Sequence, residues 1–447
     1  MNKLAFLFLG LNCLLATALM AQPKGPAKYA VLVCIDGFRP DFYLEERWPT
    51  PNLKWLAKNG IRAKGVRPVV PSVTLPDHIT MITGALPARH GIYHNQPFDP
   101  KGWNAGQYTD ASQIKVPTLW DAVKKAGGTV AALRWPVSTN APADFVFGSS
   151  RNPESIKPAG FMAELEQNVT GKMAPYLPEQ KSADFDDYRS DLRLADVGAY
   201  IIQKYKPNLM TIHFVATDHF QHEQGREGEK VEKSIAVADV CVGQLIEATK
   251  AAGIFNETVF FIVGDHGFED RHTQLAWNSV LIKEGLLFEA PDRGNWKACF
   301  KDQFLMLRDK NDKETLAKVR KILEEQPRSI RNLYRIVERA ELDQYGVDSD
   351  VALAVQTVNG VVCTTRYNVP ELVQSTPGGS HGMIPDRQDL FAGFIASGVG
   401  LRKGMTMPTL RMEDVAPHIA YLLGVDFKAP DGILYPGIIA ENLIKGY

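Results

Sequence analysis

The sequence lacks an excess of charge of either sign. Its 447 residues include 50 Lys and Arg against 51 Asp and Glu, which leaves a formal net charge of −1 at pH 7. A balanced chain has no general attraction for polyanions or for an anionic membrane surface. We therefore expect no binding of nucleic-acid duplexes, and any affinity for an anionic substrate must come from one local site.

Cysteine is also scarce. The five cysteines are scattered and form no C-x-x-C pair, which excludes a zinc–thiolate cluster. Cys34 lies in an apolar run and is typical of a small buried side chain. Cys299 and Cys363 fall in one segment, where a disulfide is conceivable, but their spacing does not establish it.

Only one apolar run is long, and it covers residues 4–20 behind Lys3. A run of this kind that ends in small side chains is typical of a signal peptide. We predict that residues 1–21 are removed and that the mature protein is secreted or periplasmic. The alternatives are an uncleaved membrane anchor, because the run nearly reaches the shortest membrane span, and a lipid anchor at Cys13. We expect no transmembrane span in the mature chain, and the sequence leaves the oligomeric state open.

Shorter apolar runs alternate with helical patterns along the rest of the chain. The expected strands are residues 29–35, 129–133, 209–214, 258–263 and 390–396, and the expected helices are residues 51–59, 118–126, 188–204 and 231–252. This alternation is typical of an α/β fold, a mostly parallel sheet sandwiched between helices. Residues 295–375 interrupt it with charged stretches and two β-rich patches, which predicts a small α+β insert or cap. The catalytic domain is then residues 28–294 and 376–447.

Polar residues follow several of these strands directly. Asp36 follows the first strand, Asp218 and His222 follow the third, and Asp265 and His266 follow the fourth. Because ligands bind beyond the carboxyl ends of parallel strands, these residues are the first candidates for a functional site. Each also has an ordinary interpretation, such as a strand-end turn or a solvated helix face.

Chemistry-bearing residues come from five separated places in the chain. They are three aspartates, three histidines and one threonine: Asp36, Asp218, Asp265, His222, His266, His381 and Thr74. Mixed imidazole and carboxylate ligands suit zinc, and two such sets match a two-metal site that clamps the attacking and leaving oxygens of a displacement. A threonine hydroxyl is a weak nucleophile, and coordination to a metal is one way to activate it.

These motifs resemble the alkaline phosphatase superfamily and, within it, the nucleotide pyrophosphatase/phosphodiesterase family, also called type I phosphodiesterases. The matching runs are VCIDGFR at 33–39, PVVPSVTLPDH at 68–78, TGALPARHGIYHN at 83–95, WP at 135–136, DHFQH at 218–222, GDHG at 264–267 and SHGM at 380–383. They cover most of the mature chain. The resemblance implies an alkaline-phosphatase-like fold and two Zn²⁺ ions per chain.

The resemblance also implies a role for each site residue. Asp36, Thr74, Asp265 and His266 would surround one zinc, with Thr74 as the nucleophile that forms a phosphothreonine. The second zinc would be held by Asp218, His222 and His381. Asn95 would donate a hydrogen bond to a non-bridging phosphoryl oxygen, where a preorganised donor stabilises developing charge.

Four further residues are weaker candidates for substrate contact. Family members usually carry Asn at the position of Asp77, and this Asp would add negative charge near an anionic substrate, point outward or cap a helix. Arg134 would either reach a substrate phosphate or be paired at the end of its strand. Trp135 and Phe98 are candidate stacking surfaces for a base or aryl group, although such aromatic residues are more often core. His78 and His94 are candidates to support the site, whereas we expect His213 to be structural or solvated.

The motifs also discriminate among related hydrolases. A sulfatase would need Cys or Ser at the nucleophile, and related monoesterases use a Lys-x-Arg or Lys-x-Lys pair where this chain has Arg134-Trp-Pro. We therefore favour a phosphodiesterase or nucleotide pyrophosphatase that acts on a small, nucleotide-like phosphoester. A phosphomonoesterase or phosphonate hydrolase is the alternative, and a non-catalytic phospho-ligand binding protein is a remote one.

Overall fold

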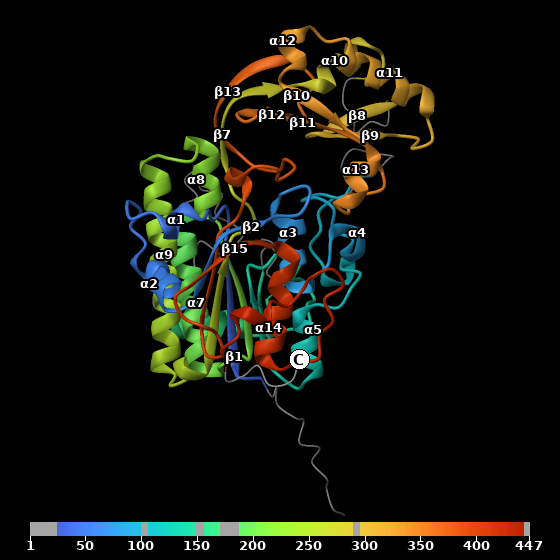
Figure 1. Cartoon of the computed structure of the whole chain (residues 1–447). Coiled ribbons are helices and arrows are strands. Elements are labelled where there is room, and N and C mark those ends of the chain that lie inside the picture. Colours follow the sequence, from blue (N-terminus) through green and yellow to red (C-terminus); the bar gives the residue numbers. More distant parts are fainter. Residues whose placement is uncertain (1–24, 100–105, 149–155, 170–186, 289–295, 442–447) are drawn as a thin grey trace, which may run out of the picture.

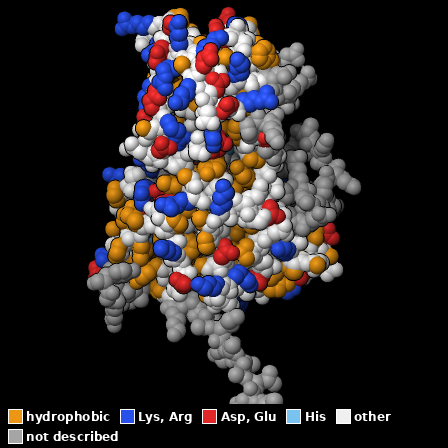
Figure 2. All heavy atoms as spheres, turned by 90° about the vertical axis from the view of Figure 1, so that its right-hand side faces the viewer, with side chains coloured by type: hydrophobic (Ala, Val, Ile, Leu, Met, Phe, Trp, Pro, Cys, Tyr) orange, Lys and Arg blue, Asp and Glu red, His pale blue; other side chains and the backbone are white. Residues whose placement is uncertain are grey.

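The computed structural model describes residues 25–99, 106–148, 156–169, 187–288 and 296–441. The predicted signal peptide, residues 1–21, lies outside this part of the chain. Within it, no helix combines the length and the apolar character that crossing a membrane requires. Figure 2 shows acidic and basic side chains intermixed over one face of the molecule, as the balanced charge of the sequence predicts.

The centre of the molecule is an eight-stranded, mostly parallel sheet, in the order β15-β2-β14-β6-β1-β5-β3-β4. Its strands are β1 Tyr29–Ile35, β2 Ile61–Arg67, β3 Val130–Leu133, β4 Phe145–Phe147, β5 Leu209–Phe214, β6 Thr258–Val263, β14 Phe394–Gly398 and β15 Met405–Arg411. β1 runs parallel to both β5 and β6, and β14 is antiparallel to its two neighbours. Every residue of β1 is buried, because helices cover both faces of the sheet.

Helices form a layer on each face of this sheet (Figure 1). One layer contains α2 Pro51–Asn59, α7 Asp187–Tyr205 and α9 Glu229–Ala251, and the other contains α3 Thr74–Thr83, α5 Leu119–Lys125 and α14 Val415–Leu423. Successive side chains of β1 point to opposite faces of the sheet, so this strand contributes to the hydrophobic core on each face. Leu32 and Cys34 belong to one core cluster and Val31 and Val33 to the other. The predicted α/β class is confirmed.

Most predicted elements agree with the structure to within a residue or two, but the last predicted strand begins later. β14 starts at Phe394 instead of residue 390, because residues 388–390 form a 3₁₀ turn. The carbonyl oxygens of Asp389 and Leu390 in that turn accept hydrogen bonds from the amides of Phe268 and Gly267. The apolar run is therefore divided between a turn beside the site and a strand in the sheet.

A second group of elements lies above the carboxyl end of the main sheet (Figure 1). Its antiparallel sheet has the order β10-β11-β9-β8 and its own apolar core. Its elements are α10 Trp277–Lys283, β8 Ala298–Lys301, β9 Phe304–Leu307, α11 Lys313–Glu324, α12 Arg328–Arg331, β10 Tyr334–Val337, α13 Arg339–Gln344 and β11 Val351–Thr357. Cys299 and Cys363 are both free, so the conceivable disulfide between them is not formed.

Two long strands connect this group to the main sheet. β7 Glu269–Leu275 pairs antiparallel with β13 Val373–Ser380 and parallel with the short β12 Val361–Cys363. β7 begins shortly after His266, and β13 ends immediately before His381. The outgoing and returning strands therefore bring two candidate site histidines to the same place.

Candidate active site

The candidate site residues lie at the carboxyl ends of the central parallel strands. Asp36 follows β1, Asp265 and His266 follow β6, and Asp218 and His222 lie on α8 Ala216–Gln224, directly after β5. Because β1 is parallel to β5 and β6, these three chain segments leave the sheet at the same edge. Thr74 joins them from the first turn of α3.

Asp218, His222 and His381 form one cluster. Their candidate ligand atoms all lie within 4.8 Å of one another. The Nε2 atoms of the two histidines are 3.1 Å apart, and they lie 3.4 Å and 3.5 Å from Oδ1 of Asp218. Asp218 and His222 share a face of α8 because they are one helical turn apart.

Asp36 and His266 form a second cluster that also includes Asp218. Nε2 of His266 lies 3.3 Å from Oδ1 of Asp36 and 3.4 Å from Oδ2 of Asp265. The other carboxylate oxygen of Asp265 accepts hydrogen bonds from the amides of Gly37 and His266, each at 3.0 Å. Asp218 thus lies between the two clusters.

The three histidine rings share one pattern of hydrogen bonding. Each Nδ1 faces a backbone carbonyl oxygen, at 3.3 Å for His222, 3.2 Å for His266 and 2.9 Å for His381. A carbonyl only accepts, so each Nδ1–H donates and Nε2 is the ring atom left to bind a metal ion or a proton. The three Nε2 atoms face the carboxylates.

Several of these inward-facing atoms are buried without a hydrogen-bond partner in the described chain. They are Oδ1 of Asp36, Oδ1 of Asp218, Oδ2 of Asp265 and Nε2 of His266. Unpaired buried acceptors are costly, and a set of acceptors aimed at one another requires a cation between them. The donor set of these residues therefore fits bound metal.

The pKa shifts at the site also indicate that positive charge is favoured there. Burial and the neighbouring Asp218 raise the pKa of Asp36 to about 6, and burial and Asp36 raise the pKa of Asp265 to about 6. Burial opposes a charge on His266, yet Asp265 and Asp36 raise its pKa to about 10. The crowded carboxylates thus favour a cation at Nε2, which is where a metal ion would bind.

Thr74 and Asn95 meet at the first turn of α3. The side chain of Asn95 accepts a hydrogen bond from the amide of Leu75 through Oδ1, at 2.9 Å. No hydrogen bond of its Nδ2 is present among the described residues, so this group can donate to a ligand. The N-terminus of α3 also favours a negative charge beside Thr74.

Comparison with known proteins decides the family. The family model of type I phosphodiesterase / nucleotide pyrophosphatase matches residues 30–382. The chain belongs to this family. Its relatives are hydrolases of phosphoester and phosphoanhydride bonds, and this chain is a hydrolase of the same class.

Two human relatives are similar over nearly the whole chain. Ectonucleotide pyrophosphatase/phosphodiesterase family member 5 is 23% identical over 426 residues, which are 94% of this chain and 78% of that protein. Family member 7 is 23% identical over 424 residues, 92% of this chain and 83% of that protein. The structure of murine family member 5, inactive and in complex with AMP, has a TM-score of 0.66 at 19% identity and covers 92% of this chain and 100% of that one. This likeness confirms the alkaline-phosphatase-like fold.

In the present chain, as a member of the type I phosphodiesterase family, two buried histidines lie next to the candidate metal ligands. His213 donates from Nε2 to Oδ2 of Asp36 at 3.0 Å, and Nδ1 of His78 lies 3.6 Å from Oδ2 of Asp265. The two rings are 4.1 Å apart, and burial lowers the pKa of His78 to about 3 and of His213 to about 4. From the sequence alone we expect His213 to be structural or solvated, and its contact with Asp36 is not predicted. The available signal was its position on β5, where it pairs with Cys34, two residues before Asp36.

Arg134 is paired at the end of its strand, so the second of its two predicted roles is the one observed. Its guanidinium donates to Asp191 at 2.7 Å and to Ser190, and its backbone has a positive φ of 52°. Asp191 also accepts from the amides of Val215 and Ala216 at the start of α8. Arg134 and Asp191 therefore hold the helix that carries Asp218 and His222.

Of the other three candidate substrate contacts, Asp77 and Trp135 are completely buried and Phe98 is half-buried. Asp77 is completely buried in α3, where its Oδ1 accepts from the amide of Val69 at 2.8 Å and burial raises its pKa well above the usual value. It therefore neither points outward nor presents a charge to substrate. Trp135 is also completely buried and packs edge-on against His78, so it is no stacking surface. Phe98 is half-buried and packs against Trp296.

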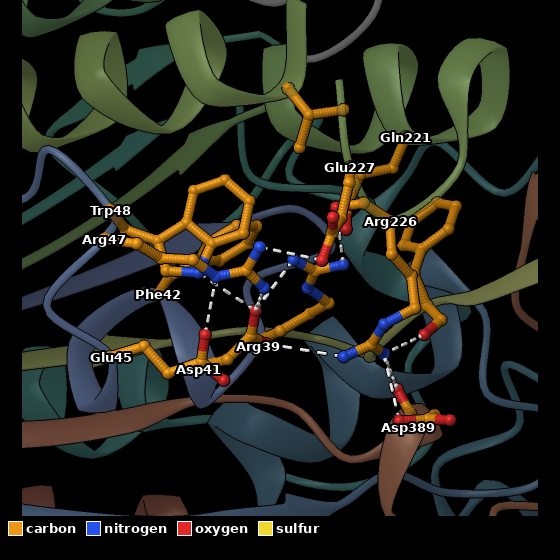
Figure 3. Close-up of polar contacts among 12 residues, drawn as sticks. Arg39, Asp41, Phe42, Glu45, Arg47, Trp48, Gln221, Arg226, Glu227 and Asp389 are labelled. Atoms are coloured by element: carbon orange, nitrogen blue, oxygen red, sulfur yellow. Dashed lines mark hydrogen bonds and ion pairs between the residues drawn. The ribbon is translucent and has the colours of Figure 1, made fainter. Parts of the chain in front are cut away.

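Two arginines connect the loops that surround the site (Figure 3). Arg39, which is 1% exposed, donates to the carbonyl oxygen of Arg226 at 2.9 Å and to Asp41 at 2.8 Å. Arg226 in turn donates to the carbonyl oxygens of Phe268 and Asp389. The ring of Phe268 lies within 5.7 Å of the rings of three site histidines, His222, His266 and His381. The arginines thus tie together the loops that follow β1, α8 and β6.

Proposed function

We propose that this chain is a zinc-dependent phosphodiesterase or nucleotide pyrophosphatase whose nucleophile is Thr74. The observation that carries the proposal is the convergence of three imidazole Nε2 atoms and three carboxylates on one place at the carboxyl ends of the central strands. Three histidines and three aspartates suit zinc better than the all-oxygen sites of Mg²⁺ or Ca²⁺.

The residues divide into two ligand sets. Asp36, Asp265 and His266 would hold one zinc beside Thr74, and Asp218, His222 and His381 would hold the other. When bound, such a pair of ions lowers the pKa of a coordinated hydroxyl and neutralises charge on the phosphoryl oxygens. His213 fixes the orientation of Asp36 through its hydrogen bond, as partners of metal-binding carboxylates do.

The reaction proceeds by two displacements at phosphorus. Oγ1 of Thr74 gives up its proton to solvent and forms a bond to phosphorus while the bond to the leaving oxygen breaks, and the leaving oxygen departs as an anion or takes a proton from solvent. Water then attacks the phosphothreonine, gives up a proton and releases Thr74 Oγ1 with its proton restored. In both steps Nδ2 of Asn95 donates to a non-bridging oxygen, and the hydrogen bond from Leu75 keeps the Asn95 amide in place.

Substitution of Thr74 tests this mechanism. Thr74→Ala should lower kcat for bis-p-nitrophenyl phosphate by at least about 10³-fold, because the covalent step is lost, while bound zinc stays close to the wild-type level. Thr74→Ser should keep measurable activity, and Thr406→Ala, at an exposed position of β15, serves as the matched control. A Thr74→Ala enzyme with the wild-type rate would refute the mechanism.

Diester rather than monoester substrates are favoured by the pairing of Arg134. A monoester carries an additional charge, and Arg134 is directed to Asp191 instead of towards the ligand set. The ratio of kcat/KM for bis-p-nitrophenyl phosphate and p-nitrophenyl phosphate measures the preference. A clear preference for the monoester would assign the chain to the phosphomonoesterase alternative.

A nucleotide-like substrate and a location outside the cytoplasm complete the proposal. A related murine protein has been solved in complex with AMP, which supports a panel of nucleoside di- and triphosphates and nucleotide diesters as the first assay. The run at residues 4–20 supports export. N-terminal sequencing of the protein from the medium or periplasm would test export, and an intact N-terminus in the cytoplasmic fraction would contradict it.

A further inference from the structure

The turn between β8 and β9 contacts the two loops that carry Asn95 and His381. We count in this turn Lys301, the last residue of β8, together with the two connecting residues Asp302 and Gln303; all three belong to the group of elements above the main sheet and are far from the site in sequence. We propose that this turn positions Asn95 and His381 for phosphoryl transfer. The inference rests on the proposed function of these two residues.

The turn holds the chain on both sides of Asn95. Nζ of Lys301 donates to the carbonyl oxygen of Gln96 at 2.5 Å, and the carboxylate of Asp302 lies 3.2 Å from Nε2 of His94. Residues 91–98 contain no helix or strand, so backbone ladders do not fix their conformation. The contacts of Lys301 and Asp302 therefore supplement the single hydrogen bond from Leu75 to Asn95.

The third residue of the turn contacts the His381 loop. Nε2 of Gln303, which is buried, donates to the carbonyl oxygen of Gly382 at 2.5 Å. The amide of Gly382 donates to Oγ of Ser72, and Nδ1 of His381 donates to the carbonyl oxygen of the same serine. Gln303 thus stabilises the backbone that orients the imidazole of His381, close to the start of α3.

Two paired and buried strands hold this turn in place. Lys301 pairs with Phe304, which leaves a two-residue hairpin turn, and Asp302 has a positive φ of 51° that Asp tolerates there. All residues of β8 and β9 are buried. A fixed hairpin can place donors with the precision that a catalytic hydrogen bond requires, whereas a displacement of about 1 Å costs roughly 10²-fold in rate.

A double-mutant cycle tests the contacts between the turn and the loop that carries Asn95. Lys301→Met should lower kcat for a diester about 10-fold with KM changed less than about 2-fold, since Asn95, whose loop loses the contact with Lys301, donates in the transition state. In an Asn95→Ala background the same substitution should have almost no further effect. Lys301→Arg should restore much of the rate. Lys297→Met, at an exposed position just before β8, is the matched control and should behave as wild type.

The contact between Gln303 and the loop that carries His381 is tested by measuring zinc affinity instead of the catalytic rate. Gln303→Leu should weaken one of two zinc sites about 10- to 100-fold in chelator competition, while Lys301→Met should leave both affinities unchanged. Asp302→Gly is a second variant that tests the contacts with the loop that carries Asn95. Gly adopts the same positive φ without strain, so the substitution removes the contact with His94 and leaves the shape of the turn unchanged.

The outcomes separate this inference from the proposed function. A wild-type enzyme without diesterase activity would refute the proposed function itself. An active wild type with multiplicative effects of Lys301→Met and Asn95→Ala, or with unchanged zinc affinity in Gln303→Leu, would refute the role of the turn alone. Circular dichroism and melting temperatures of each variant verify that it is folded.

Discussion

The Nε2 atoms of His222 and His381 lie 3.1 Å apart, although both rings use Nδ1 as the donor to a backbone carbonyl. Two lone pairs at this separation repel each other unless a cation lies between or beside them. Asp218, 3.4 Å and 3.5 Å away, adds a carboxylate to the same point. Positive charge therefore stabilises this arrangement, and a metal ion bound to these three side chains would supply it.

Loss of His381 should remove one metal ion. In His381→Ala, zinc measured by inductively coupled plasma mass spectrometry should fall from about two to about one ion per chain, because two protein ligands rarely retain zinc at this site. His219→Ala is the control, since His219 lies on α8 beside the site but its side chain is 59% exposed. Equal zinc in the two variants would contradict the ligand assignment.

Removal of metal should destabilise the fold. Chelation leaves the inward-facing carboxylates of Asp36, Asp218 and Asp265 without a counter-charge. A ligand present at about 1,000 times its Kd contributes about 4 kcal/mol, which corresponds to roughly 5–10 °C in the melting temperature of a chain of this size. Differential scanning calorimetry with EDTA, and again after zinc is restored, measures the shift. A melting temperature that EDTA does not change would argue against bound metal.

The pair of Arg134 and Asp191 should be important for stability as well as for activity. Asp191→Leu leaves the buried Arg134 guanidinium without its carboxylate counter-charge and two amides at the start of α8 without an acceptor, which should lower the free energy of unfolding by about 3–5 kcal/mol. The double variant with Arg134→Met should be more stable than Asp191→Leu alone, because the buried positive charge is removed together with its counter-charge. Urea denaturation gives the three values, and simple additivity would show that the two groups are uncoupled.

His90 should make stability depend on pH. It is completely buried, its Nδ1 accepts from the amide of Ile92, and burial lowers its pKa from 6.5 to about 3. The unfolded chain therefore binds a proton below pH 6.5 that the folded chain does not bind. The stabilising contribution is complete above pH 6.5 and decreases by up to about 1.4 kcal/mol per pH unit as the pH falls towards 3.

A matched pair of variants isolates this effect. The difference in unfolding free energy between wild type and His90→Asn should narrow as the pH falls from 6.5 to 4, because Asn has no proton to bind. His272→Asn, at an exposed position, should leave the pH profile of stability unchanged. Parallel profiles for wild type and His90→Asn would contradict the assignment.

Local patterns in the sequence predicted the positions of most of the central strands. The apolar runs at 29–35, 209–214 and 258–263 coincide with β1, β5 and β6, because a strand buried on both faces has no polar position. The roles of Arg134 and Trp135 could not be assigned in this way. Each depends on a partner far away in sequence, namely Asp191 on α7 and His78 on α3.

The sequence by itself determined which residues are available for chemistry and where they leave the sheet. Asp36, Asp265 and His266 follow parallel strands, and parallel strands end at one edge whatever the loops do. Only the tertiary structure decided which of the remaining residues face them. It brought His381 back along β13, placed His213 against Asp36, buried Asp77 and set the β8–β9 turn beside Asn95. Those contacts join segments up to about 300 residues apart, and they arise from the packing of whole elements, which no local pattern contains.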